Sequence, residues 1–344
     1  MRVAVLTGGG DCPGLNPAIR AVVMRLMELG HEPIGLELGW KGLVEGLVTD
    51  LSLERVEEII YQGGTMLGSS RTNPFRVGNE EQLEKCLKNV EALRLDAICA
   101  LGGEDTLGVA AKFFKLGVNT VGIPKTMDND LDCTDYTFGF DTAVSVAVDA
   151  ADRLRDTARS HRRILVLEVM GRHAGWVALY TGIGAGADWI LIPEVALDLE
   201  EMCAHLKRCR DRGKQYGLVV VSEGIDIPHA DTSSVATDAF GHVILRERGV
   251  GEFIAKEIEQ RVGVETRFAV LGHVQRGGAP TVFDRVLASR LGLRAADLVH
   301  ERDWGKMASI QGNEIVAVPL EDAVKSLKTI PLELWQQTKS LFSQ

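Results

Sequence analysis

The chain contains 344 residues, which at roughly 150 residues per domain predicts about two domains, each large enough to bury a core without disulfides. Hydrophobic residues make up 45% and charged residues 25%, the composition of a folded globular protein rather than of a disordered or collagen-like one. The net charge of −10 argues against nucleic acid or an anionic membrane as a partner, so a phosphate site would depend on individually placed residues.

The N-terminal residues and the cysteines indicate the compartment. Residues 1–10 hold one Arg and an apolar run that is too short for a signal peptide. Apolar stretches such as 218–222 are far below the ~20 residues that a membrane span needs. We therefore expect a cytoplasmic location. No CxxC spacing occurs, so neither a zinc site nor a disulfide framework is expected from the six cysteines, Cys12, Cys86, Cys99, Cys133, Cys203 and Cys209.

In chain order, short apolar runs that end in glycine or in polar loops predict seven strands, at residues 2–7, 33–38, 96–103, 120–124, 163–171, 218–224 and 268–278. Helical spacing separates most of them, as in 16–29 and 80–93. This alternation predicts an α/β fold with parallel sheets covered on both faces, where ligands bind beyond the carboxyl ends of the strands. The polar stretch 226–241 predicts a surface loop.

The loop after the first strand is rich in glycine and runs directly into a predicted helix. Gly8, Gly9 and Gly10 let the backbone approach an anion, and the helix start favours negative charge, so the loop indicates a phosphate site. Leu15 and Asn16 stand where a P-loop requires Lys and Ser or Thr, which disfavours a P-loop NTPase. A turn without a ligand is the alternative.

Two further loops carry charged side chains at strand ends. Glu104 and Asp105 are adjacent carboxylates, for which a divalent cation, naturally magnesium, is the expected stabiliser, with simple capping of a helix as the alternative. Lys125, Thr126 and Asp128 supply a fixed positive charge, a hydroxyl donor and a candidate general base, as phosphoryl transfer to an alcohol requires. A polar turn is the alternative for this second loop.

The second half of the chain repeats the pattern, with Arg and His side chains that could clamp a substrate phosphate, although a lone surface Arg is usually solvated. These residues follow or begin predicted strands: Arg163, Met170, Gly171, Arg172, Glu223, Arg267, His273, Val274, Gln275 and Arg276.

Taken together, the motifs resemble those of the phosphofructokinase family, from the first residues to about Arg294. The motifs are TGGGDCPGLNPAIR, GGEDT, PKTMDND, SHRR, MGRHAGW, SEG, ETR and LGHVQRGG. The resemblance implies two similar Rossmann-like three-layer domains with mostly parallel sheets and an active site in the cleft between them. The phosphoryl-donor domain would comprise 1–139 and about 276–306, and the sugar-phosphate domain 140–275 and about 307–344. A homodimer or homotetramer with shared active sites is also implied.

The resemblance further implies residue roles. Gly10 and Arg71 would contact the phosphoryl donor, Glu104 would bind Mg²⁺, Thr126 would hold the transferring group and Asp128 would be the base. The sugar pocket would be lined by Met127, Met170, Gly171, Arg172 and Glu223. Arg163 and Arg267 of another subunit would join the segment His273, Val274, Gln275 and Arg276 around the sugar phosphate.

The residues at positions 105 and 125 predict which phosphoryl donor the protein uses. ATP-using members of the family carry Gly where this chain has Asp105 and Lys125. A carboxylate at 105 would repel the α-phosphate of a nucleotide, whereas the Lys125 ammonium can neutralise pyrophosphate. Both residues match the pyrophosphate-using branch, which transfers a phosphoryl group reversibly to the 1-hydroxyl of fructose 6-phosphate. Catalysis would then use Asp105, Lys125, Thr126, Asp128 and Arg172.

Three alternatives remain at this point: the same chemistry with ATP, a non-catalytic regulatory subunit of the same fold, and a nicotinamide dehydrogenase. The regulatory subunit would lack Asp128 or Glu104, and both are present. The dehydrogenase depends only on Gly8 and its neighbours and on Glu37, and Pro13 occupies its third glycine position.

Overall fold

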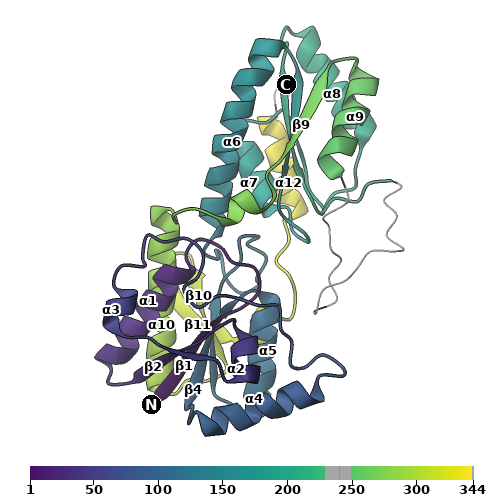
Figure 1. Cartoon of the computed structure of the whole chain (residues 1–344). Coiled ribbons are helices and arrows are strands. Elements are labelled where there is room, and N and C mark those ends of the chain that lie inside the picture. Colours follow the sequence, from purple (N-terminus) through teal and green to yellow (C-terminus); the bar gives the residue numbers. More distant parts are fainter. Residues whose placement is uncertain (229–239, 241–248, 343–344) are drawn as a thin grey trace.

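The computed structural model describes residues 1–228, 240 and 249–342, which form two lobes (Figure 1). The lower lobe in Figure 1 holds the N-terminus, and the upper lobe holds the last helices of the chain. The chain passes to the upper lobe before α6 (Phe140–His161), returns before α10 (Val282–Glu301), and crosses again before α12 (Leu332–Thr338).

The lower lobe is built on a seven-stranded sheet in the order β11-β10-β5-β4-β1-β2-β3. Its strands from β10 to β2 are parallel, and antiparallel strands flank them at both edges. The strands are β1 (Arg2–Thr7), β2 (Glu32–Leu36), β3 (Val48–Asp50), β4 (Ala97–Gly102), β5 (Thr120–Pro124), β10 (Lys306–Gln311) and β11 (Glu314–Pro319).

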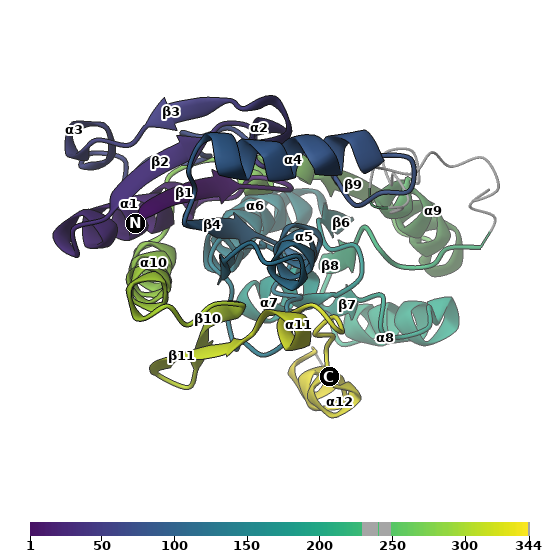
Figure 2. The same cartoon turned by 90° about the horizontal axis from the view of Figure 1, so that it is seen from below.

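Alternating side chains of this sheet point to two separate cores. Val3 and Val5 belong to the buried cluster that contains α1 (Leu15–Glu28) and α10. Ala4 and Leu6 belong to the second cluster, on the other face. The elements of that face, seen from below in Figure 2, are α2 (Trp40–Glu45), α4 (Glu80–Ala92), α5 (Glu104–Lys115) and α11 (Leu320–Ala323), while α3 (Leu53–Val56) packs beside α1. Both faces are therefore covered, as the apolar strands predicted.

The upper lobe has a four-stranded sheet in the order β7-β8-β6-β9, with all strands parallel. The helices pack in two pairs, α6 with α7 and α8 with α9. Its elements are β6 (Ile164–Val169), α7 (Trp176–Gly184), β7 (Trp189–Leu191), α8 (Leu199–Asp211), β8 (Gly217–Ser222), α9 (Val250–Val262), β9 (Thr266–Val270) and the 3₁₀ helices η1 (Gly272–Arg276) and η2 (Lys339–Leu341).

The starts of α6 and α10 are tied together where the chain crosses between lobes. The buried Asp284 carboxylate accepts hydrogen bonds from the Thr142 backbone N–H at 2.8 Å and from its hydroxyl at 2.5 Å. Burial raises the pKa of Asp284 to about 6. This contact fixes two helix N-termini directly beside the connection between the lobes.

The expected α/β fold with two mostly parallel sheets is confirmed, and several details differ. Residues 306–319, expected mainly in the second domain, form a hairpin whose first strand pairs with β5, so they extend the first sheet. The final predicted strand is shorter, because 272–276 form a 3₁₀ helix. The predicted loop 226–241 lies mostly outside the described residues. In the part of the chain that the structure describes, no helix is long and apolar enough to cross a membrane.

Candidate active site

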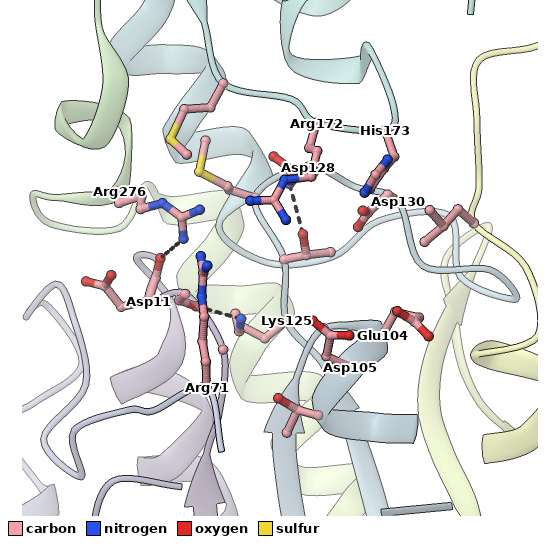
Figure 3. Close-up of a pocket in the computed structure, with 18 of the residues that line it drawn as sticks. Asp11, Arg71, Glu104, Asp105, Lys125, Asp128, Asp130, Arg172, His173 and Arg276 are labelled. Atoms are coloured by element: carbon pink, nitrogen blue, oxygen red, sulfur yellow. Dashed lines mark hydrogen bonds between the residues drawn. The ribbon is translucent and has the colours of Figure 1, made fainter. Parts of the chain in front are cut away.

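A cavity of about 390 Å³ lies between the lobes, where loops from the carboxyl ends of both sheets meet (Figure 3). Figure 3 shows the Arg172 and His173 side chains of the upper lobe opposite Arg71 and Lys125 of the lower lobe. The remaining lining residues are Gly9, Gly10, Asp11, Gly103, Glu104, Asp105, Thr106, Thr126, Met127, Asp128, Asp130, Met170, Glu223, His273, Arg276 and Leu327.

The glycine loop after β1 forms one wall, and Gly10 permits a close approach of Arg276. A Cβ atom at Gly10 would lie 1.9 Å from the Arg276 Nη1 atom, so a larger residue would displace the guanidinium. Arg276 Nη1 also donates a 3.2 Å hydrogen bond to the Asp11 carbonyl. The Lys125 ammonium donates to the Gly10 carbonyl at 2.6 Å, and burial lowers its pKa. Cationic side chains from two loops thus gather at the glycine loop.

Glu104 and Asp105 are the first two residues of α5, and both line the cavity. The cap position itself is Gly103, so these carboxylates lie within the first turn, where they also favour the helix dipole. They line a second cavity of about 600 Å³ as well, together with Lys112 and Gly108. Asp105 therefore stands where the interlobe cavity adjoins this neighbouring space.

The loop after β5 buries Asp128. The Asp128 backbone N–H donates to the Thr126 hydroxyl at 3.1 Å, which folds the loop tightly, and Asn129 adopts φ +51°. The Asp128 Oδ1 atom is buried without a hydrogen-bond partner among the described residues. Burial and the neighbouring Asp130 raise the pKa of Asp128 to about 6, and burial also raises that of Asp130. A buried carboxylate with a free oxygen and a pKa below neutrality can accept a proton.

The upper lobe supplies two loops that pack closely against each other. Met170 and Arg172 follow β6, and Glu223 follows β8. A Cβ atom at Gly224 would lie 2.2 Å from the Arg172 carbonyl oxygen, so glycine allows these loops to touch. Burial and the Asp128 charge raise the pKa of Glu223 to about 7. Two carboxyl groups from opposite lobes therefore face one space and influence each other.

Most residues to which the family resemblance gave a role meet in this cavity, and five of them do not line it. Gly171 lies between two lining residues, and Gln275 is buried while Val274 is 67% exposed. Arg163 and Arg267 lie at the amino ends of β6 and β9, whereas the cavity lies at the carboxyl ends. At the amino ends the Glu265 carboxylate accepts hydrogen bonds from both side chains, at 2.6 and 2.5 Å. These two arginines do not reach the cavity of their own chain.

Some lining residues had no assigned role in the sequence analysis. Asp11, Asp130 and His173 fall within motifs already quoted, so the motifs contained the signal. Thr106 is the last residue of the quoted motif GGEDT. Leu327 comes from the segment between α11 and α12, which carries no motif and reaches the cavity only through the fold.

A sequence model of the phosphofructokinase family matches residues 2–299. With the two-lobed α/β fold and the interlobe cavity, this match means that the chain belongs to the phosphofructokinase family.

Relatives named for two different phosphoryl donors have similar sequence identity to this chain. The chain is 51% identical over its whole length, and over 99% of the relative, to "Pyrophosphate--fructose 6-phosphate 1-phosphotransferase" of Dictyoglomus thermophilum. It is 48% identical to "ATP-dependent 6-phosphofructokinase 3" of Streptomyces coelicolor, covering 96% of this chain and 97% of that one. Among solved structures, Saccharomyces cerevisiae phosphofructokinase has a TM-score of 0.81 and 29% identity; the match covers 99% of this chain but only 47% of the yeast chain.

Proposed function

We propose that the protein is a pyrophosphate-dependent phosphofructokinase, which transfers a phosphoryl group from pyrophosphate to the 1-hydroxyl of fructose 6-phosphate, reversibly. The observation that carries the proposal is that Lys125 and Asp105 both line the same cavity. Overall identity does not separate the donors, because relatives of both kinds are about half identical to this chain. The donor must therefore be argued from these side chains.

Lys125 favours a short, highly charged donor. Lys125 is 4% exposed as a residue and its ammonium donates to the Gly10 carbonyl, so its charge is weakly screened by water. Arg71 and Arg276 add guanidinium groups to the same wall of the cavity. Gly10, Arg71 and Lys125 would hold the diphosphate.

Asp105 disfavours a nucleotide. A nucleoside triphosphate is longer than pyrophosphate and would have to extend from the interlobe cavity toward the neighbouring one, past Asp105. A carboxylate at that junction would lie close to the α-phosphate and repel it. Pyrophosphate ends before this point and avoids the repulsion.

The residues fit a magnesium ion bound together with the donor. The cavity is lined by the carboxylates of Asp11, Glu104, Asp105, Asp128, Asp130 and Glu223, which outnumber its Arg and Lys side chains. In the described part of the chain no three His, Cys, Asp or Glu side chains form a ready-made metal cage. Mg²⁺ commonly uses one or two carboxylates plus substrate phosphates. Glu104 would be the protein ligand, and the metal would neutralise charge on the donor oxygens.

Asp128 is the proposed base. It would accept the proton of the sugar hydroxyl as that oxygen attacks phosphorus and phosphate leaves. Thr126 would hold the transferring phosphoryl group, and Lys125 and Arg172 would stabilise charge on its oxygens. Met127, Met170, Gly171, Arg172 and Glu223 would line the sugar pocket.

The sugar phosphate would lie near His273 and Arg276, completed by Arg163 and Arg267 of a partner subunit. The apolar edge of the upper sheet supports assembly, because Phe268 and Val270 on the edge strand β9 are 44% and 55% exposed. Apolar side chains along a free strand edge favour pairing with another copy. We propose a homo-oligomer with shared sites, acting in the cytoplasm, where the free state of all six cysteines is maintained.

The reverse reaction tests this function. Incubated with fructose 1,6-bisphosphate, Mg²⁺ and inorganic phosphate, the protein should form fructose 6-phosphate and pyrophosphate. An ATP-using enzyme of the same fold would need ADP as acceptor and would ignore phosphate. ADP-dependent, phosphate-independent reversal would therefore contradict the proposal.

A further inference from the structure

Lys328 lies in the segment between α11 and α12 and makes three hydrogen bonds to the loop that carries Asp128. Its ammonium donates to the Asn129 side-chain oxygen at 3.1 Å and to the Thr134 and Asp135 carbonyl oxygens at 2.8 and 2.9 Å. All three acceptors are neutral oxygens. The ammonium thus uses its full donor capacity on a single loop.

The main chain around Lys328 is attached to the same loop. The Lys328 N–H donates to the Asp130 carbonyl at 2.8 Å, and Leu327 forms an antiparallel bridge with Leu131. Leu327 also lines the interlobe cavity. The segment around Lys328 therefore runs antiparallel to part of the loop that carries Asp128.

The other side of the segment is held by the upper lobe. The Trp176 indole N–H donates to the Lys328 carbonyl at 2.8 Å, and the ammonium lies 5.8 Å from the centre of that ring. Two residues further on, the Ile330 N–H donates to the Glu194 carboxylate at 3.0 Å, which also accepts from Gly175. Lys328 thus contacts a loop of one lobe while its backbone is fixed to the other.

Asn129 makes this contact relevant to the chemistry. It separates Asp128 from Asp130 and has φ +51°, a conformation that L-residues other than Asn and Asp seldom adopt. Its side-chain oxygen accepts from the Lys328 ammonium, from the Thr137 N–H at 3.0 Å and from the Thr137 hydroxyl at 3.4 Å. Without the ammonium, one of the three donors to this oxygen is lost, which loosens the turn and allows the Asp128 carboxylate to move from its position.

We propose that Lys328 is a positioning residue for phosphoryl transfer, which holds the Asp128 loop in its reactive conformation through Asn129 and couples that conformation to the contact between the lobes. The proposal rests on the role of Asp128 in the proposed function. Burial lowers the pKa of Lys328 to about 8 despite the nearby Asp130, Asp132 and Asp135. A cation kept in a position that disfavours its charge is consistent with a positional role.

The test compares Lys328→Met with a matched control, Lys339→Met. Lys339 is another C-terminal lysine; it pairs with Glu201 at 2.9 Å and lies 5.5 Å from the ring of Trp189, away from the cavity. Lys328→Met should lower kcat ~10- to 100-fold, because a misplacement of about 1 Å has that effect, with the KM of each substrate within about threefold. Lys339→Met should keep the wild-type kcat at a comparable melting temperature.

A kcat for Lys328→Met within about threefold of the control would overturn the proposal, as would a loss confined to KM. If Lys328→Met does not accumulate as folded protein, Lys328→Gln is compared by the same criteria. All variants are assayed with whichever donor the wild type uses. A wrong donor is then evident from the wild type alone, whereas the positioning role depends on the ratio between variants.

A double-mutant cycle tests the route through Asn129. Asn129→Gly removes the acceptor and tolerates φ +51°. If Lys328 acts through Asn129, the double variant should have a kcat within about threefold of the less active single variant, because both changes remove the same Lys328–Asn129 hydrogen bond. If instead the fold-losses in kcat of the two single variants multiply in the double variant, the coupling through Asn129 is wrong.

Discussion

The Lys125 ammonium lies 2.6 Å from the Gly10 carbonyl oxygen, so the loops after β5 and β1 meet through a buried cation. These strands are separated in the sheet by β4, which leads through Gly103 into α5, whose first residues are Glu104 and Asp105. Lys125 therefore brings a positive charge to the cavity that Glu104, the proposed metal ligand, and Asp105 also line. It leads to predictions about the base, the donor and the sugar phosphate.

Asp128→Asn should be nearly inactive and yet more stable than the wild type. Loss of the base should lower kcat by ~10²–10⁴-fold with small changes in KM. Because burial raises the pKa of Asp128 to about 6, its ionised form costs folding free energy at neutral pH, and the amide should raise the free energy of unfolding by about 1–3 kcal/mol. Urea unfolding at pH 7.5 and steady-state kinetics measure both.

The sign of the stability effect fixes its pH dependence. A carboxyl group whose pKa is higher in the folded state costs stability fully above pH 6, and this cost is relieved as pH falls toward the usual value of 3.8. The advantage of Asp128→Asn should therefore shrink between pH 6 and 4. The exposed carboxylate control, Asp211→Asn on α8, should show neither effect. A stability advantage that grows on acidification would contradict this assignment.

The activity of the wild type should fall below about pH 6, because a protonated Asp128 cannot accept the hydroxyl proton. The Asp130 charge helps to raise that pKa, so Asp130→Asn should move the acid limb of kcat/KM to lower pH. Profiles of both proteins from pH 5 to 8 make the comparison. An acid limb that stays in place or moves upward would exclude Asp128 as the titrating group.

Asp105→Gly should give measurable ATP use, and Lys125→Gly should cause the larger loss of pyrophosphate use. The first change removes the carboxylate that would repel an α-phosphate, and the second removes a buried counter-charge. The effects should be non-additive, because nearby residues commonly couple by ~0.5–3 kcal/mol. Steady-state kinetics of wild type, single and double variants with each donor measure this. If neither the single nor the double variant that carries Asp105→Gly gains ATP use, the electrostatic argument fails.

Arg163→Ala and Arg267→Ala should chiefly raise the KM for the sugar phosphate, since a clamp on a non-reacting phosphate works through binding. Arg261→Ala, a surface arginine of α9 paired with Glu257, is the control. If the site is shared, mixing Asp128→Ala with Arg267→Ala subunits should restore some activity. Verified mixed oligomers without recovered activity would mean that each subunit builds its own pocket.

The sequence predicted the parts of the molecule whose signals are local. Apolar runs gave the central strands, and loops at their carboxyl ends held the side chains that the fold gathers, from Gly10 to Glu223. The hairpin formed by β10 and β11 was not predicted, because its pairing with β5 joins residues nearly two hundred positions apart.

Part of the candidate site could not be predicted from the sequence, because only long-range packing brings its residues together. Lys328 and Leu327 have no neighbouring motif, and only the fold brings them to Asn129 and the cavity. The motif SHRR, through the family resemblance, implied that Arg163 serves the site of another subunit. The structure adds that this side chain is held by Glu265 at the far end of its strand, which a sequence pattern does not reveal.

A competition between donors in one tube tests the central claim most directly. The purified wild-type protein is mixed with fructose 6-phosphate, Mg²⁺ and equal concentrations of pyrophosphate and ATP, and the reaction is followed by phosphorus NMR. We predict that the pyrophosphate signal falls while inorganic phosphate and a sugar 1-phosphate ester rise together, and that the three ATP signals stay constant. Loss of the γ-phosphate signal of ATP with appearance of ADP, while pyrophosphate stays constant, would contradict the assignment of the donor.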